Sequence, residues 1–192
     1  MGNVMDYLEW RGDLTFDQSP FNDVDNVILS QLAYVNFRDV IPSVQMNKGI
    51  TLKAAAQLFF DLHTEEELMQ DKSFIKDAPK LLKKAAQTNR FRDVILSDYV
   101  DMVDETLEKQ FGAFHIKLSP QCTYVAFRGT DDTLVGWKED FNMSFISPVP
   151  SQEDAVKYLD DTCSYIRGKL YVGGHSKGGN LAMYAAMQCN EI

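Results

Sequence analysis

A glycine-rich segment near the C-terminal end of the sequence limits the fold more than any other feature. Gly174 and Gly178 lie two residues before and two residues after Ser176. The apolar stretch 170–172 precedes the segment, and the Ala/Met-rich stretch 181–187 follows it. Glycines at this spacing let a strand turn sharply into a helix with a serine exposed at the turn. We therefore expect a strand–turn–helix unit, a nucleophile elbow, with Ser176 as the candidate nucleophile.

Two other glycine-rich motifs do not fit the same residues. A P-loop ends in Gly-Lys-Ser or Gly-Lys-Thr, whereas the order here is Ser176-Lys177-Gly178. A dinucleotide-binding turn needs G-x-G-x-x-G, which the glycine pairs 173–174 and 178–179 do not supply. We therefore expect no nucleotide cofactor. A glycine-rich turn with a purely structural role remains the alternative to a catalytic elbow.

A second turn follows the β-rich stretch 122–127. The tetrahedral intermediate of acyl transfer needs two hydrogen-bond donors aimed at its oxyanion. One donor is normally the backbone N–H after the nucleophile, here that of Lys177, and the other comes from a loop after an earlier strand. Thr130 lies in such a loop and has a hydroxyl group. We expect Thr130 and Lys177 to form an oxyanion hole, with a simple strand-ending turn as the alternative.

The first part of the chain has the apolar periodicity of helices. Helical spacing recurs in 25–35 and in 51–63, and a third helix is predicted to begin after Asp77. Either Asp23 or Asp25 would cap the first of these helices.

The later part has the patterns of strands and of two further helices. Alternation is clear at 111–118, weaker at 93–103, and 122–127 is apolar enough for a strand buried on both faces. A capping box beginning at Ser151 predicts a helix that runs to about Arg167.

These patterns predict an α/β fold with a mostly parallel sheet and flanking helices, because strands and helices alternate after residue 120. We expect one domain, 1–192, in which 1–90 is a mostly helical lead-in and 91–192 is the strand–helix core with the elbow. The sequence leaves open whether the lead-in is a layer on that domain or a small cap.

Composition and charge exclude several classes of protein. With 192 residues, 45% of them apolar, the chain is long enough for one hydrophobic core. Its net charge of −9 argues against binding to nucleic acid or to an anionic membrane. No stretch approaches the roughly 18 apolar residues of a transmembrane helix, no secretory signal is visible, and the three cysteines predict no disulfide framework. We expect a cytoplasmic protein.

Other catalytic and metal-binding patterns are weak. Ser73 and Lys76 match the Ser-x-x-Lys of penicillin-recognising enzymes, but 97–99 only half matches Ser-Asp-Asn and no Lys-Thr-Gly exists. Both residues are better explained as helix surface. His-Glu-x-x-His, paired Cys-x-x-Cys and EF-hand spacings are absent from the sequence, so we expect no metal site.

Taken together, the motifs resemble the class 3 lipase branch of the α/β-hydrolases. The segment 128–130 is similar to an Arg-Gly-Ser/Thr turn, Trp137 and Asp140 to the Trp-x-x-Asp that follows it, and 174–179 to the elbow. The chain resembles still more closely a bacterial family of lipase-like proteins of unknown function. That likeness runs from about residue 7 to the end and is carried by 10–13, 21–25, 136–141 and 174–182.

The resemblance implies a role for each matched residue. Ser176 would be the nucleophile, and Thr130 and the Lys177 amide would form the oxyanion hole. Arg128, Trp137 and Asp140 would brace the oxyanion loop. No cofactor is implied, and the substrate would be a small-molecule ester or a lipid.

The acid and base of a catalytic triad are not found where the resemblance puts them. In α/β-hydrolases both follow the nucleophile, but no histidine follows Ser176. His175 adjoins the nucleophile, His63 is expected on a solvated helix end, and His115 is expected to fill a strand position.

In the family the elbow strand is central, so here it would leave an unpaired apolar edge through which the chain could self-associate. We therefore expect this chain to be the N-terminal part of a longer hydrolase whose C-terminal strands are missing. A gene product of this length acting alone is the alternative.

Two functions follow as hypotheses. The first is a serine ester hydrolase, lipase- or acylesterase-like, that acts through an acyl-enzyme on Ser176, with little turnover by this chain alone. The second is a non-catalytic α/β-hydrolase-fold protein that binds a ligand or a partner.

Overall fold

The computed structural model describes residues 2–44, 48–70, 77–131 and 133–190. Ser73 and Lys76 lie outside these ranges. Within them the chain forms eight helices and five strands. The helices are α1 (Val4–Arg11), α2 (Asp23–Leu32), α3 (Leu52–Leu62), α4 (Glu65–Gln70), α5 (Ala78–Ala85), α6 (Leu134–Asn142), α7 (Pro150–Cys163) and α8 (Lys177–Gln188). The strands are β1 (Ile50–Thr51), β2 (Ile95–Asp104), β3 (Lys109–Ser119), β4 (Cys122–Phe127) and β5 (Lys169–Gly174).

The five strands form one mixed sheet in the order β1-β2-β3-β4-β5, and most of its pairings are antiparallel. Only β4 and β5 are parallel. The expectation of a mostly parallel sheet is therefore wrong. The reason is the length of the connections: 105–108 joins β2 to β3, and 120–121 joins β3 to β4. Connections this short reverse the chain and cannot contain a crossover helix.

The expected alternation of strand and helix after residue 120 is confirmed. The chain runs from β4 through α6 and α7 into β5 and then α8, and this crossover makes β5 parallel to β4. Phe127 at the end of β4 lies opposite Gly174 at the end of β5. In the described part of the chain β5 is an edge strand. Further strands beyond it, and self-association through it, stay predictions.

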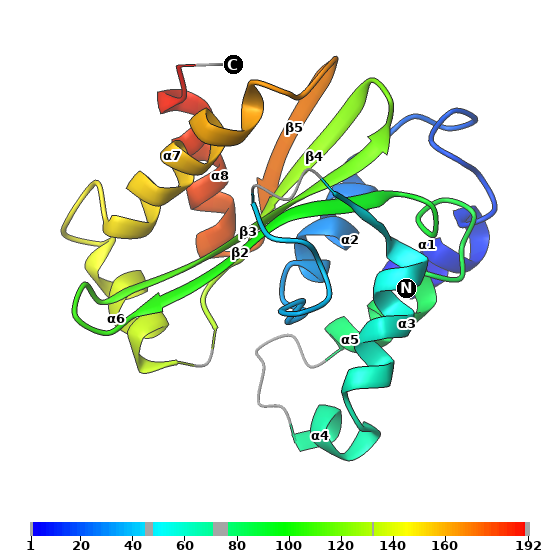
Figure 1. The fold of residues 1–192 in the computed structure, drawn as a ribbon, viewed down its shortest axis with the longest axis horizontal. Coiled ribbons are helices and arrows are strands. Elements are labelled where there is room, and N and C mark those ends of the chain that lie inside the picture. Colours follow the sequence, from blue (N-terminus) through cyan, green and yellow to red (C-terminus); the bar gives the residue numbers. More distant parts are fainter. Residues whose placement is uncertain (1, 45–47, 71–76, 132, 191–192) are drawn as a thin grey trace.

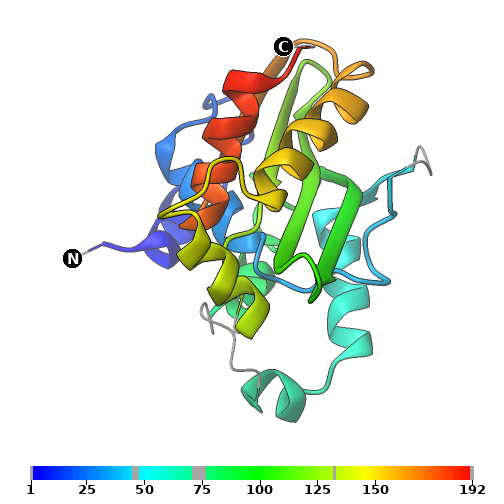
Figure 2. The same ribbon diagram turned by 90° about the vertical axis from the view of Figure 1, so that its left-hand side faces the viewer.

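Helices cover both faces of the sheet (Figures 1 and 2). The helices α6, α7 and α8 lie on one side, and α1, α2, α3 and α5 lie on the other. The alternation predicted for 111–118 divides β3 between two cores. Phe114 and Ile116 pack with the N-terminal helices, whereas Phe111 and Ala113 pack with α7 and α8. In the described residues no helix is both long enough and apolar enough to cross a membrane.

Helix boundaries differ from the predicted ones mainly at the caps. Asn22, not an aspartate, caps α2, and Asp25 completes the capping box by accepting from the Asn22 amide at 3.0 Å. Asp77 precedes α5 but makes no capping hydrogen bond.

Helix α7 begins after Val149, whose amide donates to Gln152 Oε1 at 2.9 Å, so Ser151 is not the cap. The helix ends at Cys163, before the predicted Arg167. Caps depend on local backbone angles that apolar periodicity does not report.

A buried ion pair ties the N-terminal segments together. Arg90 Nε and Nη2 lie 2.7 and 2.5 Å from the carboxylate oxygens of Asp25, and neither side chain is exposed. The guanidinium also donates to backbone carbonyls in the loop 14–20. It lies over the ring of Phe16, 4.3 Å from the centroid. Arg90 thus fixes a loop that has no regular hydrogen-bond ladder of its own.

We predict that Arg90→Met lowers the free energy of unfolding by about 3 kcal/mol or more, because it leaves the Asp25 carboxylate buried without its partner. Urea denaturation measures the change. Arg92→Met is the matched control, because Arg92 and its partner Asp93 are exposed and such pairs contribute about 1 kcal/mol or less. Equal effects of the two substitutions would contradict the prediction.

Candidate active site

The nucleophile elbow, residues 174–178, has the predicted strand–turn–helix form. Ser176 connects β5 to α8, is exposed, and has φ 57° and ψ −127°. A positive φ is uncommon for a residue with a side chain and is strained in this region. Such strain is characteristic of a serine presented at the top of a strand–turn–helix unit. The geometry of Ser176 therefore fits a nucleophile position.

Glycines bring the elbow into direct contact with the end of β4. A Cβ atom on Gly178 would lie 2.2 Å from the Phe127 carbonyl oxygen and 2.9 Å from the Gly129 amide nitrogen. A Cβ atom on Gly174 would lie 2.5 Å from the same Phe127 oxygen. These neighbours are backbone atoms, so they cannot rotate away. The two segments predicted separately from sequence, the elbow and the turn 128–130, are thus packed against each other.

Both candidate oxyanion donors have unused hydrogen-bonding capacity. Thr130 is buried, and its hydroxyl oxygen has no hydrogen-bond partner among the described residues. Lys177 is the first residue of α8, so its amide is one of the four at a helix N-terminus that have no acceptor within the helix. The positive end of the helix dipole lies at the same place. The local field therefore favours a developing negative charge.

Unpaired buried polar atoms occur in three segments of the described structure. Buried polar groups in folded proteins are nearly always hydrogen-bonded, and exceptions often mark functional sites. Four such side-chain atoms in the described ranges have neither a hydrogen bond nor an ion pair, and they belong to the turn 128–130, to β3 and to the first turn of α7. They are Thr130 Oγ1, Arg128 Nε, Gln110 Nε2 and Ser151 Oγ.

The Lys177 side chain has a role that the sequence did not reveal. We predicted only its backbone amide as functional, and we predicted Asp140 as a brace for the oxyanion loop. The neighbouring Glu139 is fully buried and forms an ion pair with Lys177, Nζ to Oε2 at 2.8 Å, and the bracing role of Asp140 stays a prediction. Burial lowers the pKa of Lys177, and the Glu139 carboxylate opposes that shift. The spacing of charged residues on this short helix does not indicate whether residue 139 or residue 140 is the buried partner.

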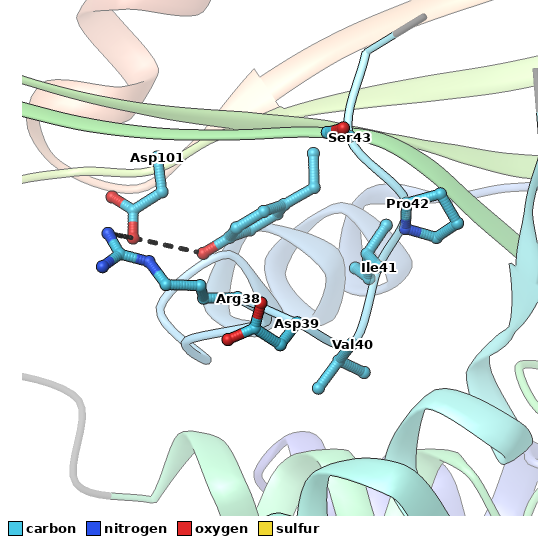
Figure 3. Close-up of a pocket in the computed structure, with 8 residues that line it drawn as sticks. Arg38, Asp39, Val40, Ile41, Pro42, Ser43 and Asp101 are labelled. Atoms are coloured by element: carbon cyan, nitrogen blue, oxygen red, sulfur yellow. Dashed lines mark hydrogen bonds and ion pairs between the residues drawn. The ribbon is translucent and has the colours of Figure 1, made fainter. Parts of the chain in front are cut away.

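Arg128 braces the turn from the side of β2. It is buried and forms an ion pair with Asp101. Asp101 also lines a cavity of about 500 Å³, together with Tyr99 and the run 38–43. Figure 3 shows Asp101 and Arg38 on one side of this cavity and Ile41 and Pro42 on the other. The cavity therefore adjoins the residue that holds Arg128.

Tyr34, which the sequence analysis did not select, lies beneath the elbow. Its hydroxyl oxygen is 3.1 Å from His175 Nδ1, and it donates to the His175 carbonyl oxygen at 3.3 Å. A Cβ atom on Gly129 would lie 2.1 Å from the same hydroxyl. Burial raises the pKa of Tyr34 to about 12, so the phenol stays protonated at neutral pH. No motif or periodicity marks this residue.

A Thr–His–Asp arrangement exists away from the elbow. His115 Nε2 lies 3.0 Å from Thr162 Oγ1, and His115 Nδ1 lies 3.7 Å from Asp98 Oδ2. The Thr162 hydroxyl is fully buried and donates to the Tyr158 carbonyl at 2.6 Å. It is therefore not an accessible nucleophile. His115 fills a strand position as expected, and the structure places it in the core.

In the described structure neither His63 nor His175 forms a salt bridge with a carboxylate, although His63 contributes to the lowered pKa of Glu67. His63 is partly buried and stacks on Phe59, at a ring-centroid distance of 4.4 Å. Within the described ranges, no three His, Cys, Asp or Glu side chains are grouped to hold a metal ion.

Stability is predicted to depend on pH through His115. Burial lowers its pKa from 6.5 to about 4, against the opposing effect of Asp98. Between these values the unfolded chain binds more protons, so the free energy of unfolding falls as pH drops, by at most about 1.4 kcal/mol per pH unit.

Urea denaturation at several pH values between 7 and 4 measures this dependence, and His115→Gln is the comparison that separates it from the titration of carboxyl groups. Identical pH profiles for the two proteins would show that His115 does not contribute.

The elbow contact predicts unequal effects of two adjacent glycine substitutions. Gly178→Ala should lower the free energy of unfolding by about 1–3 kcal/mol, because its Cβ meets backbone that cannot move aside. Gly179→Ala should cost less, because the nearest backbone atom would lie at 3.0 Å and alanine favours the helix. Thermal unfolding compares the two variants, and a larger loss for Gly179→Ala would overturn this account of the elbow.

Comparison with known proteins identifies a family and no individual relative. No curated protein and no solved structure matches the chain. A family model described as Mbeg1-like matches residues 85–192, a range that contains β2 to β5, the turn 128–130 and the elbow. Because this range is more than half of the 192 residues, the chain belongs to the Mbeg1-like family.

Proposed function

We propose that the chain carries the nucleophile and the oxyanion hole of a serine ester hydrolase that acts through an acyl-enzyme. The observation that supports this most strongly is the positive φ of Ser176 at an exposed turn packed against the turn 128–130. The motif resemblance to class 3 lipases points to the same chemistry.

In the proposed reaction the Ser176 hydroxyl oxygen attacks the carbonyl carbon of an ester. The carbonyl oxygen becomes an oxyanion that accepts hydrogen bonds from the Lys177 amide and the Thr130 hydroxyl. Collapse of the intermediate breaks the ester C–O bond and leaves an acyl group on Ser176, and the alcohol leaves with a proton that balances the one lost by the Ser176 hydroxyl. Water then attacks the acyl group through a second tetrahedral intermediate, which releases a carboxylic acid and restores the hydroxyl. The positive end of the α8 dipole stabilises both tetrahedral intermediates.

A small-molecule ester or a lipid with an apolar acyl group is the proposed substrate. Large apolar side chains are exposed along α6 and the segment after it, which follow the turn 128–130 in the chain. They are Leu134, Trp137, Phe141, Phe145 and Ile146. An apolar surface of this kind favours an uncharged acyl chain over a charged substrate.

The general base is the part of the proposal that the described residues do not supply. His175 adjoins the nucleophile, but its Nδ1 is engaged by Tyr34. His115 lies in the core against Thr162. A serine without its base loses on the order of 10⁴ in rate, so we expect slow turnover from these residues alone. The same observation favours the second candidate, a non-catalytic protein that binds a ligand or a partner.

Labelling with a fluorophosphonate probe tests the proposal, because the probe reacts covalently with activated serines. Because the described residues supply no base, we expect slow labelling of the parent at Ser176 and none of Ser176→Ala. Thr130→Val should slow labelling by about 100-fold, the effect of removing one oxyanion donor. Mass spectrometry of the labelled peptide identifies the site. Equal labelling of Ser176→Ala and the parent would refute the assignment, and no labelling of a folded parent would favour the binding protein.

A further inference from the structure

The Lys177 ammonium group is buried and saturated with hydrogen bonds. Its side chain has no exposed surface. Nζ lies 2.7 Å from the Gln110 carbonyl oxygen, 2.9 Å from Gln110 Oε1 and 2.8 Å from Glu139 Oε2. An ammonium group has three N–H donors, so each donor has one acceptor. The lysine side chain is therefore held in one position.

Glu139, on α6, connects this ammonium to β3 and to α7. Its Oε2 also accepts a hydrogen bond from the Gln110 backbone N–H at 2.9 Å, and its Oε1 accepts one from the Ser151 backbone N–H at 2.9 Å. One carboxylate on α6 thus binds β3, the first turn of α7 and the first residue of α8. Removing either charge would leave the other buried without compensation.

Burial alone does not explain a lysine at this position. An apolar side chain of similar length would fill the same space without the cost of removing a charge from water. The ion pair has a property that apolar packing lacks, because its hydrogen bonds fix direction as well as position. The ion pair therefore orients Lys177, the residue that follows the candidate nucleophile. The Lys177 backbone amide lies in the first turn of α8, and the ends of helices fray.

We propose that Glu139 and the Lys177 side chain are positioning residues that hold the Lys177 backbone amide in the oxyanion hole. This inference rests on the proposed function for its catalytic consequence. An oxyanion donor loses its effect when it shifts by a fraction of an ångström. The buried ion pair connects Lys177 to β3. Strand β3 pairs with β4, and β4 leads into the turn 128–130.

Two variants remove the charges of the Lys177–Glu139 ion pair but keep side chains of similar length. Lys177→Met keeps the length of the side chain and the backbone amide but removes the ammonium. The double variant Lys177→Met with Glu139→Gln also removes the uncompensated carboxylate, so it is the variant to use if the single one fails to fold. Asp25→Asn is the matched control, because it breaks the other fully buried ion pair, with Arg90, away from the elbow.

Two measurements are made on each folded variant. Amide hydrogen exchange compares residues 174–179 with residues 113–118 of β3, which lie outside the Lys177–Glu139 network. The rate of fluorophosphonate labelling reports on Ser176. We expect both Lys177 variants to exchange faster at the elbow while residues 113–118 are unchanged, and to be labelled about 10- to 100-fold more slowly. Asp25→Asn should lower the unfolding temperature without a selective change at the elbow or in the labelling rate.

The outcomes distinguish this inference from the proposed function. Unchanged exchange at 174–179 in the Lys177 variants overturns the positioning role, even if Ser176 is labelled normally in the parent. If Asp25→Asn is labelled as slowly as the Lys177 variants, the positioning role is also overturned, because any loss of stability would then be enough to slow labelling. Faster local exchange together with no labelling of the parent supports the positioning of the amide and rejects the hydrolase.

Discussion

Backbone contact between the elbow and the end of β4 is the constraint on which the candidate site depends. At Gly178 and Gly174 the chains approach so closely that one added carbon would lie 2.2 and 2.5 Å from the Phe127 carbonyl oxygen. The parallel pairing of β4 and β5 brings these atoms together, and the α6–α7 crossover produces that pairing. The strained backbone of Ser176 persists because the contact on either side leaves it no alternative.

Buried ion pairs hold segments in place, two of them beside this contact and one among the N-terminal elements. One fixes the N-terminal loop to α2, one fixes α8 to α6 and β3, and one fixes the turn after β4 to β2. Each pair crosses between elements far apart in the sequence, so each defines tertiary packing and not local structure. The stabilisation is conditional, since loss of one partner leaves an isolated charge in the core. The three pairs are Arg90–Asp25, Lys177–Glu139 and Arg128–Asp101.

The elements that could be predicted were those with a local cause. The strand 122–127 and the helix after Thr51 were predicted closely, because a β-rich apolar run and helical periodicity are each encoded within a few residues. The direction of the strands was not, because it depends on connection length, and the tight turn at Pro120 was not recognised as one. Tyr34 and Glu139 escaped prediction because their partners are 141 and 38 residues away along the chain.

By itself the sequence determined the elbow, since glycines two residues on either side of Ser176 permit a backbone that other residues resist. It also predicted the alternation that divides β3 between two faces. Only the tertiary structure decided that the sheet is mostly antiparallel and that the two faces of β3 belong to two separate cores. It alone revealed the partner of the Lys177 ammonium. The physical reason is that close packing and buried charge are properties of segments brought together in space, whereas glycine spacing and periodicity are properties of the chain.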